Sequence, residues 1–73
     1  MGCFDAKVFA RNLKTVMTYN KTKIKDLANA LNFSEEYISK LRTGKRTPPL
    51  PVVYQMCEFF DVSMDWLCGR KED

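Results

Sequence analysis

A three-residue interruption, Asn32-Phe33-Ser34, separates two short segments with helical apolar spacing and constrains the fold more than any other feature. Asn tolerates the left-handed conformation that can end a helix, and Ser is a preferred first cap of the next one. Phe33 and Ile38 stand at the two positions of a hydrophobic staple, which fixes how the chain enters a helix. The sequence therefore predicts two helices joined by a tight turn.

Apolar residues at helical spacing predict the elements around this turn. Asp5 is expected to cap a first helix, and residues 19–22 lack apolar periodicity and are predicted to form a loop. The second helix is predicted from about 23 to 31. The third begins after the serine and ends near Gly44, a residue that favours the left-handed position after a helix.

The C-terminal third predicts two more helices. Pro51 can stand in the first turn of a fourth helix, where its missing N–H costs little, and Ser63 can cap a short fifth. Because no segment is typical of a strand and the chain supports one small core, we expect a single all-α domain over residues 1–73. The expected core residues are Phe9, Leu13, Val16, Met17, Ile24, Leu27, Ala28, Leu31, Ile38, Leu41, Val52, Val53, Met56, Cys57, Phe60, Trp66 and Leu67.

Charge is distributed unevenly along the chain. Residues 1–47 hold ten Lys and Arg against four Asp and Glu, a net +6, whereas residues 48–73 hold two against five, a net −3. A basic half suits a polyanionic partner, but lysines are also common on an ordinary solvated surface. Charge alone therefore leaves both interpretations open.

Residue types that serve catalysis or metal binding are scarce. The chain has no histidine, and its cysteines, Cys3, Cys57 and Cys68, lack the CxxC spacing of a zinc site. We expect free thiols and no catalytic site, metal site, cofactor or small-molecule substrate. No apolar run reaches the ~20 residues of a membrane span, and the N-terminus lacks a signal-peptide pattern. We therefore expect a cytoplasmic protein.

The joint between the second and third predicted helices has the spacing of a helix-turn-helix, in which two helices linked by about three or four residues cross at roughly 90–120°. Ala28 supplies the small residue at the crossing, Phe33 the apolar turn residue, and Ile38 the apolar contact of the second helix. Any compact helical hairpin uses similar residues. The spacing alone therefore favours DNA binding only slightly.

The chain from Phe9 to Gly69 also resembles the lambda-repressor-like (Cro/C1, XRE-type) helix-turn-helix family. The matching motifs are Phe9…Leu13-Lys14, Leu27-Ala28…Leu31-Asn32-Phe33-Ser34, Ile38-Ser39-Lys40, Gly44-Lys45-Arg46, Pro48…Leu50 and Asp61-Val62-Ser63-Met64-Asp65-Trp66-Leu67. The resemblance implies a compact five-helix fold that binds double-stranded DNA through the major groove. It also implies a transcription regulator, usually a repressor, that binds a palindromic operator as a homodimer.

By position, the resemblance implies two groups of DNA contacts. Those toward base edges are Glu35, Glu36 and Lys40, assisted by Ser39 and Tyr37. Those near phosphates are Lys23, Ser34, Thr43, Lys45, Arg46 and Thr47. Ile24 stands where the family often has a Gln phosphate contact, so Lys23 would have to replace it.

Two of these roles have a second interpretation. Lys40 can donate to guanine O6 or N7, and a glutamate can accept from cytosine N4. Glu35 and Glu36 can instead support only the helix dipole, and Lys40 can be a solvated lysine or a phosphate contact. Both assignments stay predictions at this point.

A rival function is a protein-interaction module, such as an antitoxin or adaptor, that keeps the fold without operator binding. The low net charge and the acidic start of the third helix favour it. The acidic C-terminal segment also carries candidates for exposed apolar side chains, Tyr54, Phe59 and Leu67. Tyr54 and Phe59 are either a self-complementary dimer patch or ordinary scattered surface residues.

Overall fold

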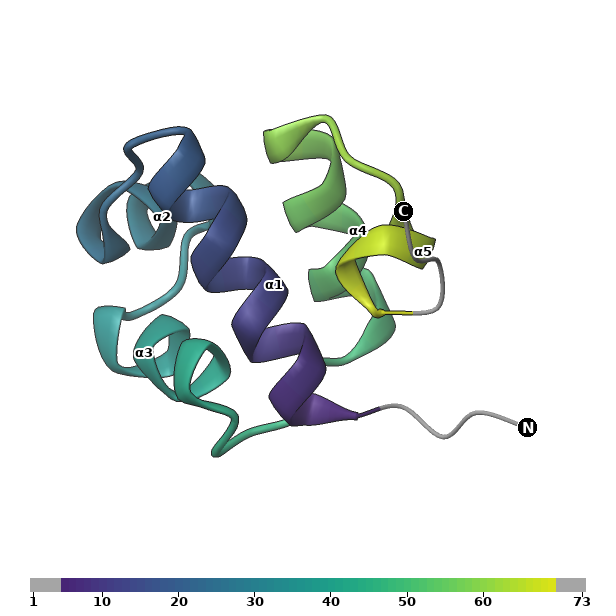
Figure 1. Ribbon diagram of the computed structural model, residues 1–73. Coiled ribbons are helices and arrows are strands. Elements are labelled where there is room, and N and C mark those ends of the chain that lie inside the picture. Colours follow the sequence, from purple (N-terminus) through teal and green to yellow (C-terminus); the bar gives the residue numbers. More distant parts are fainter. Residues whose placement is uncertain (1–4, 70–73) are drawn as a thin grey trace.

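The computed structural model describes residues 5–69, which form five α-helices and no strand. The helices are α1 (Ala6–Tyr19), α2 (Ile24–Leu31), α3 (Glu35–Thr43), α4 (Leu50–Phe60) and α5 (Met64–Leu67). α1 runs through the middle of the molecule, with α2 and α3 on one side and α4 and α5 on the other (Figure 1). The predicted all-α, five-helix fold is confirmed.

Three helix starts and two helix ends lie where the local sequence predicts them. Asp5, Ser34 and Ser63 each accept a hydrogen bond from a backbone N–H two or three residues further on, at 2.9, 3.1 and 3.1 Å. Asn32 and Gly44 adopt left-handed conformations, with φ of 63° and 80°, at the ends of α2 and α3. These caps satisfy backbone groups that have no partner inside the helix.

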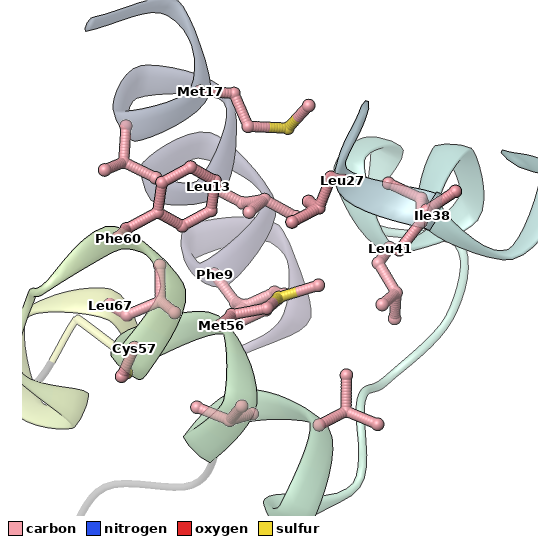
Figure 2. Packing of buried hydrophobic residues seen from close by; sticks show 14 residues of the cluster. Phe9, Leu13, Met17, Leu27, Ile38, Leu41, Met56, Cys57, Phe60 and Leu67 are labelled. Atoms are coloured by element: carbon pink, nitrogen blue, oxygen red, sulfur yellow. The ribbon is translucent and has the colours of Figure 1, made fainter. Parts of the chain in front are cut away.

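All five helices contribute to one apolar core. Figure 2 shows that α1 places Phe9 and Leu13 between side chains of α2 and α3 on one side and those of α4 and α5 on the other. From α3, Ile38 and Leu41 are completely buried. Burying a side chain of this size stabilises the fold by about 1.5–3 kcal/mol. The inner face of α3 is therefore firmly held, and its opposite face is presented to solvent in a constant orientation.

Several residues differ from the sequence prediction. Tyr19 belongs to α1 and not to the following loop, because the hydrogen bonding of α1 continues to the next residue. Ile24, Leu31 and Trp66 are only partly buried, since they lie at or near the ends of short helices that the core covers incompletely. Leu67 appears both among the expected core residues and among the candidates for exposure; the core placement is confirmed and the exposed one is wrong, because α5 packs against both α1 and α4 and buries this side chain.

Cys57 is a buried free thiol and Cys68 is half-buried, whereas Cys3 lies outside the described residues. Burial raises the pKa of the Cys57 thiol. Residues 5–69 contain no cluster of His, Cys, Asp or Glu able to hold a metal ion. None of their helices combines the length and apolar character needed to cross a bilayer.

Candidate nucleic-acid interface

The turn between α2 and α3 is held by its own backbone and by the core beneath it. The Phe33 N–H donates to the Ala28 carbonyl at 2.8 Å across the left-handed Asn32. Ala28 and Ile38 are both buried in the core, and α2 packs directly against α3. The two helices therefore form a rigid unit, as the spacing of the small and apolar residues predicts.

The outer face of α3 carries the residues predicted to contact bases. Glu35, Glu36 and Lys40 are exposed, whereas Ser39 and Tyr37 are half-buried. Lys40 Nζ lies 3.5 Å from Glu36 Oε2, and the two side chains are 47% and 78% exposed. The i,i+4 order of Glu before Lys is the favourable one on a helix. That spacing is readable in the sequence, so this ion pair could have been predicted there.

The ion pair is a weak constraint. Exposed i,i+4 pairs contribute about 0.3–0.5 kcal/mol, because water screens the two charges and both long side chains lose rotamer freedom. The Lys40 ammonium and the Glu36 carboxylate can therefore separate and bind other partners at a small cost in free energy. The outer face of α3 thus offers one strong donor and one strong acceptor within a single helical turn.

Tyr37 connects the start of α3 with the loop that follows its end. Its ring centroid lies 4.9 Å from that of Phe33, with the two rings tilted by 46°. The Arg46 guanidinium carbon lies 5.2 Å from the Tyr37 centroid, within the range of a cation–π interaction. Residues nine positions apart have no helical or strand relation that sequence patterns can detect. The contact between Tyr37 and Arg46 was accordingly missed.

A shallow hollow of about 180 Å³ lies beside the first turns of α3. Its lining consists of Ser34, Glu36, Tyr37, Lys40 and Arg46, which are all predicted DNA contacts. The Ser34 hydroxyl oxygen accepts the capping hydrogen bond, and its own proton can still be donated outward. The hollow therefore combines cationic, hydroxyl and carboxylate groups that converge on solvent.

The family model described as helix-turn-helix matches residues 14–67, which is most of the chain and includes all of α2 and α3. The chain belongs to the Cro/C1-type, XRE-like helix-turn-helix family. Searches of curated proteins and of solved structures gave no significant match. As a member of this family, the protein is a DNA-binding regulator.

Thr43 of this helix-turn-helix protein is engaged inside its own helix. Its hydroxyl donates to the Ser39 carbonyl at 3.1 Å and lies 3.3 Å from the Lys40 carbonyl. A phosphate oxygen only accepts hydrogen bonds, so the Thr43 hydroxyl must rotate away from the helix before it can bind one. The structure thus gives Thr43 an internal role beside the predicted phosphate contact.

The remaining predicted phosphate contacts stand at the edges of the helix-turn-helix unit. Lys23 is exposed immediately before α2, and its backbone N–H donates to the Asp26 carboxylate at 3.4 Å. Lys45 and Thr47 are exposed in the loop after α3. Every charged side chain described between residues 48 and 69 is acidic. The described cations thus lie in α1, α2, α3, the loop between α1 and α2, and the loop after α3.

Proposed function

We propose that this helix-turn-helix protein recognises a specific duplex DNA sequence with α3 in the major groove and acts as a transcriptional repressor. One observation carries this proposal. The inner face of α3 is held in the core by Ile38 and Leu41, while Glu36 and Lys40 project from its exposed face. A recognition helix presents its first turns to base edges, and reading bases requires that those side chains stand on a rigid support.

Affinity and specificity are assigned to different residues. Lys45, Arg46 and Lys23 neutralise phosphates and release counterions, and the hydroxyls of Ser34 and Thr47 add neutral donors to the same backbone. None of these contacts depends strongly on the base sequence. They orient the protein on the duplex and supply most of its binding free energy.

Specificity is assigned to the exposed face of α3. Lys40 donates to guanine O6 or N7, and Glu35 or Glu36 accepts from cytosine N4, with Ser39 as a secondary contact. A good base contact contributes about 1–3 kcal/mol, which exceeds the ~0.3–0.5 kcal/mol of the Glu36–Lys40 ion pair. A matching base therefore separates the pair. A mismatched base leaves a desolvated carboxylate without a donor, and this penalty rejects the wrong sequence.

We further propose that the protein binds as a homodimer on a palindromic operator. Tyr54 and Phe59 of α4 are 54% and 45% exposed and are the candidates for a two-fold contact. A hydrogen bond from the Tyr54 phenol to Glu58 and the negative charge of that carboxylate raise the pKa of Tyr54 above its ordinary 10.0. Two recognition helices related by a two-fold axis would reach half-sites about 34 Å apart.

A second candidate function is a protein-interaction module that has lost operator binding. The acidic character of residues 48–69 favours it, because Glu58, Asp61 and Asp65 suit a basic protein partner better than DNA. The two Glu residues at the start of α3 also favour an interaction module over DNA binding, since their carboxylates repel phosphates.

Selection of bound duplexes from a random pool, followed by salt titration of the selected site, tests the proposal. We expect one enriched palindrome and an affinity that falls steeply with salt, as several phosphate contacts require. A scrambled duplex of equal length is the control. Absence of any duplex binding at low salt would overturn the DNA-binding proposal in favour of the interaction module. Binding without sequence enrichment would overturn specific recognition alone.

A further inference from the structure

The position of Tyr37 suits the support of neighbouring side chains better than direct contact with DNA bases. It is the third residue of α3 and is half-buried, unlike the exposed Glu36 and Lys40 on the same helix. Its ring contacts Phe33, which itself packs against the core, and the Arg46 guanidinium lies over the same ring. The ring therefore links a side chain anchored in the core to a cation in the exposed loop.

This link affects what Arg46 can do. An unrestrained arginine loses rotamer freedom when it binds a phosphate, and that loss weakens binding. A cation–π interaction uses the delocalised charge of the guanidinium and requires none of its five N–H groups to donate a hydrogen bond to an acceptor. Arg46 is thus held beside the hollow at the start of α3 with its donors available.

We infer that Tyr37 is a positioning residue that prepares Arg46 to bind a DNA phosphate next to the recognition helix. The inference rests on the proposed DNA binding and replaces the predicted base contact of Tyr37 with an indirect role. Only the aromatic ring is required, because the ring face attracts the cation. The phenol hydroxyl is dispensable.

Two substitutions distinguish the role of the Tyr37 ring from that of its hydroxyl. Tyr37→Phe keeps the ring, and we expect unchanged affinity, salt dependence and base preference. Tyr37→Leu keeps an apolar contact for Phe33 but removes the ring. A cation–π interaction at an exposed site contributes roughly 0.5–1 kcal/mol, so we expect Tyr37→Leu to weaken binding about two- to fivefold. The loss should be equal on the selected and the scrambled duplex.

A double-mutant cycle with Arg46→Ala identifies the route of this effect. Arg46→Ala should reduce the salt slope by about one unit, and Tyr37→Leu should cause no further loss of affinity in the Arg46→Ala background. Fluorescence anisotropy measures affinity, and circular dichroism verifies that each variant keeps the helical content of the parent. The Arg46→Ala protein with intact Tyr37 is the matched control.

Three outcomes would overturn the inference. Losses that add in the double variant would show that Tyr37 acts independently of Arg46. A changed base preference in Tyr37→Phe would restore the base-contact role. Failure of the parent protein to bind any duplex at low salt would remove the proposed function together with this inference. Duplex binding by the parent with additive losses would remove the inference alone.

Discussion

Gly69, just after α5, and Gly44, just after α3, allow a backbone effect to be separated from a steric one. Both adopt left-handed conformations, with φ of 83° and 80°. A Cβ at Gly44 would meet its nearest neighbour, Lys7, at an ordinary contact distance of 3.5 Å. A Cβ at Gly69 would instead overlap Cγ1 of Val8 in α1. Valine is stiff on a helix and has little freedom to turn away.

These geometries predict different costs for the same substitution. The left-handed conformation costs a non-glycine residue about 1–2 kcal/mol, and alanine recovers about 0.4–1 kcal/mol by restricting the unfolded chain. Gly44→Ala should therefore lower the free energy of unfolding by about 1 kcal/mol. Gly69→Ala adds overpacking of about 1–3 kcal/mol, for a total of about 2–4 kcal/mol. The free energy of unfolding of a domain of this length is about 4–11 kcal/mol in all, so the difference between the two substitutions is measurable.

Urea denaturation followed by circular dichroism provides the assay, with an unchanged slope m as the check on two-state behaviour. Combining Gly69→Ala with Val8→Ala should remove the steric contribution to the stability loss and leave the backbone contribution. The two substitutions should therefore show a coupling energy of about 1–3 kcal/mol. Equal losses at Gly44 and Gly69, or additive effects of the Val8 and Gly69 substitutions, would refute the reasoning that α1 and α5 approach closely here.

Four further outcomes are expected. Lys40→Ala should cost about 1–3 kcal/mol on the selected duplex and flatten preference at one base position, as read by repeated selection. Lys45→Ala should weaken all sequences alike and reduce the salt slope by about one; an altered base preference with an unchanged slope would contradict its phosphate role. Leu41→Ala should lower the free energy of unfolding by about 2–5 kcal/mol in urea, because it opens a cavity beneath α3. Burial raises the pKa of Cys57 above its ordinary 9.0 in the folded state. The folded state then holds the thiol proton more tightly, so the contribution of Cys57 to stability is fully present below the unfolded pKa of 9.0 and is lost as pH rises through the raised folded pKa; stability at alkaline pH should therefore fall less steeply in Cys57→Ala.

The local features of this protein were predictable because they depend on neighbouring residues. A serine directly before a helix can cap the N-terminus of that helix. A glycine or asparagine directly after a helix can adopt the left-handed conformation. Neither depends on what packs nearby. Ser34, Asn32 and Gly44 therefore lie as predicted. The Glu36–Lys40 ion pair follows from helical spacing in the same way.

The sequence by itself thus determined the five helices, their caps and the exposed face of α3, since each depends on residues within a few positions. Only the tertiary structure decided which distant residues meet. It packed α5 on α1, placed Gly69 directly against Val8, and brought Arg46 over the ring of Tyr37. Such contacts depend on how the helices pack as whole bodies, which no short-range spacing encodes.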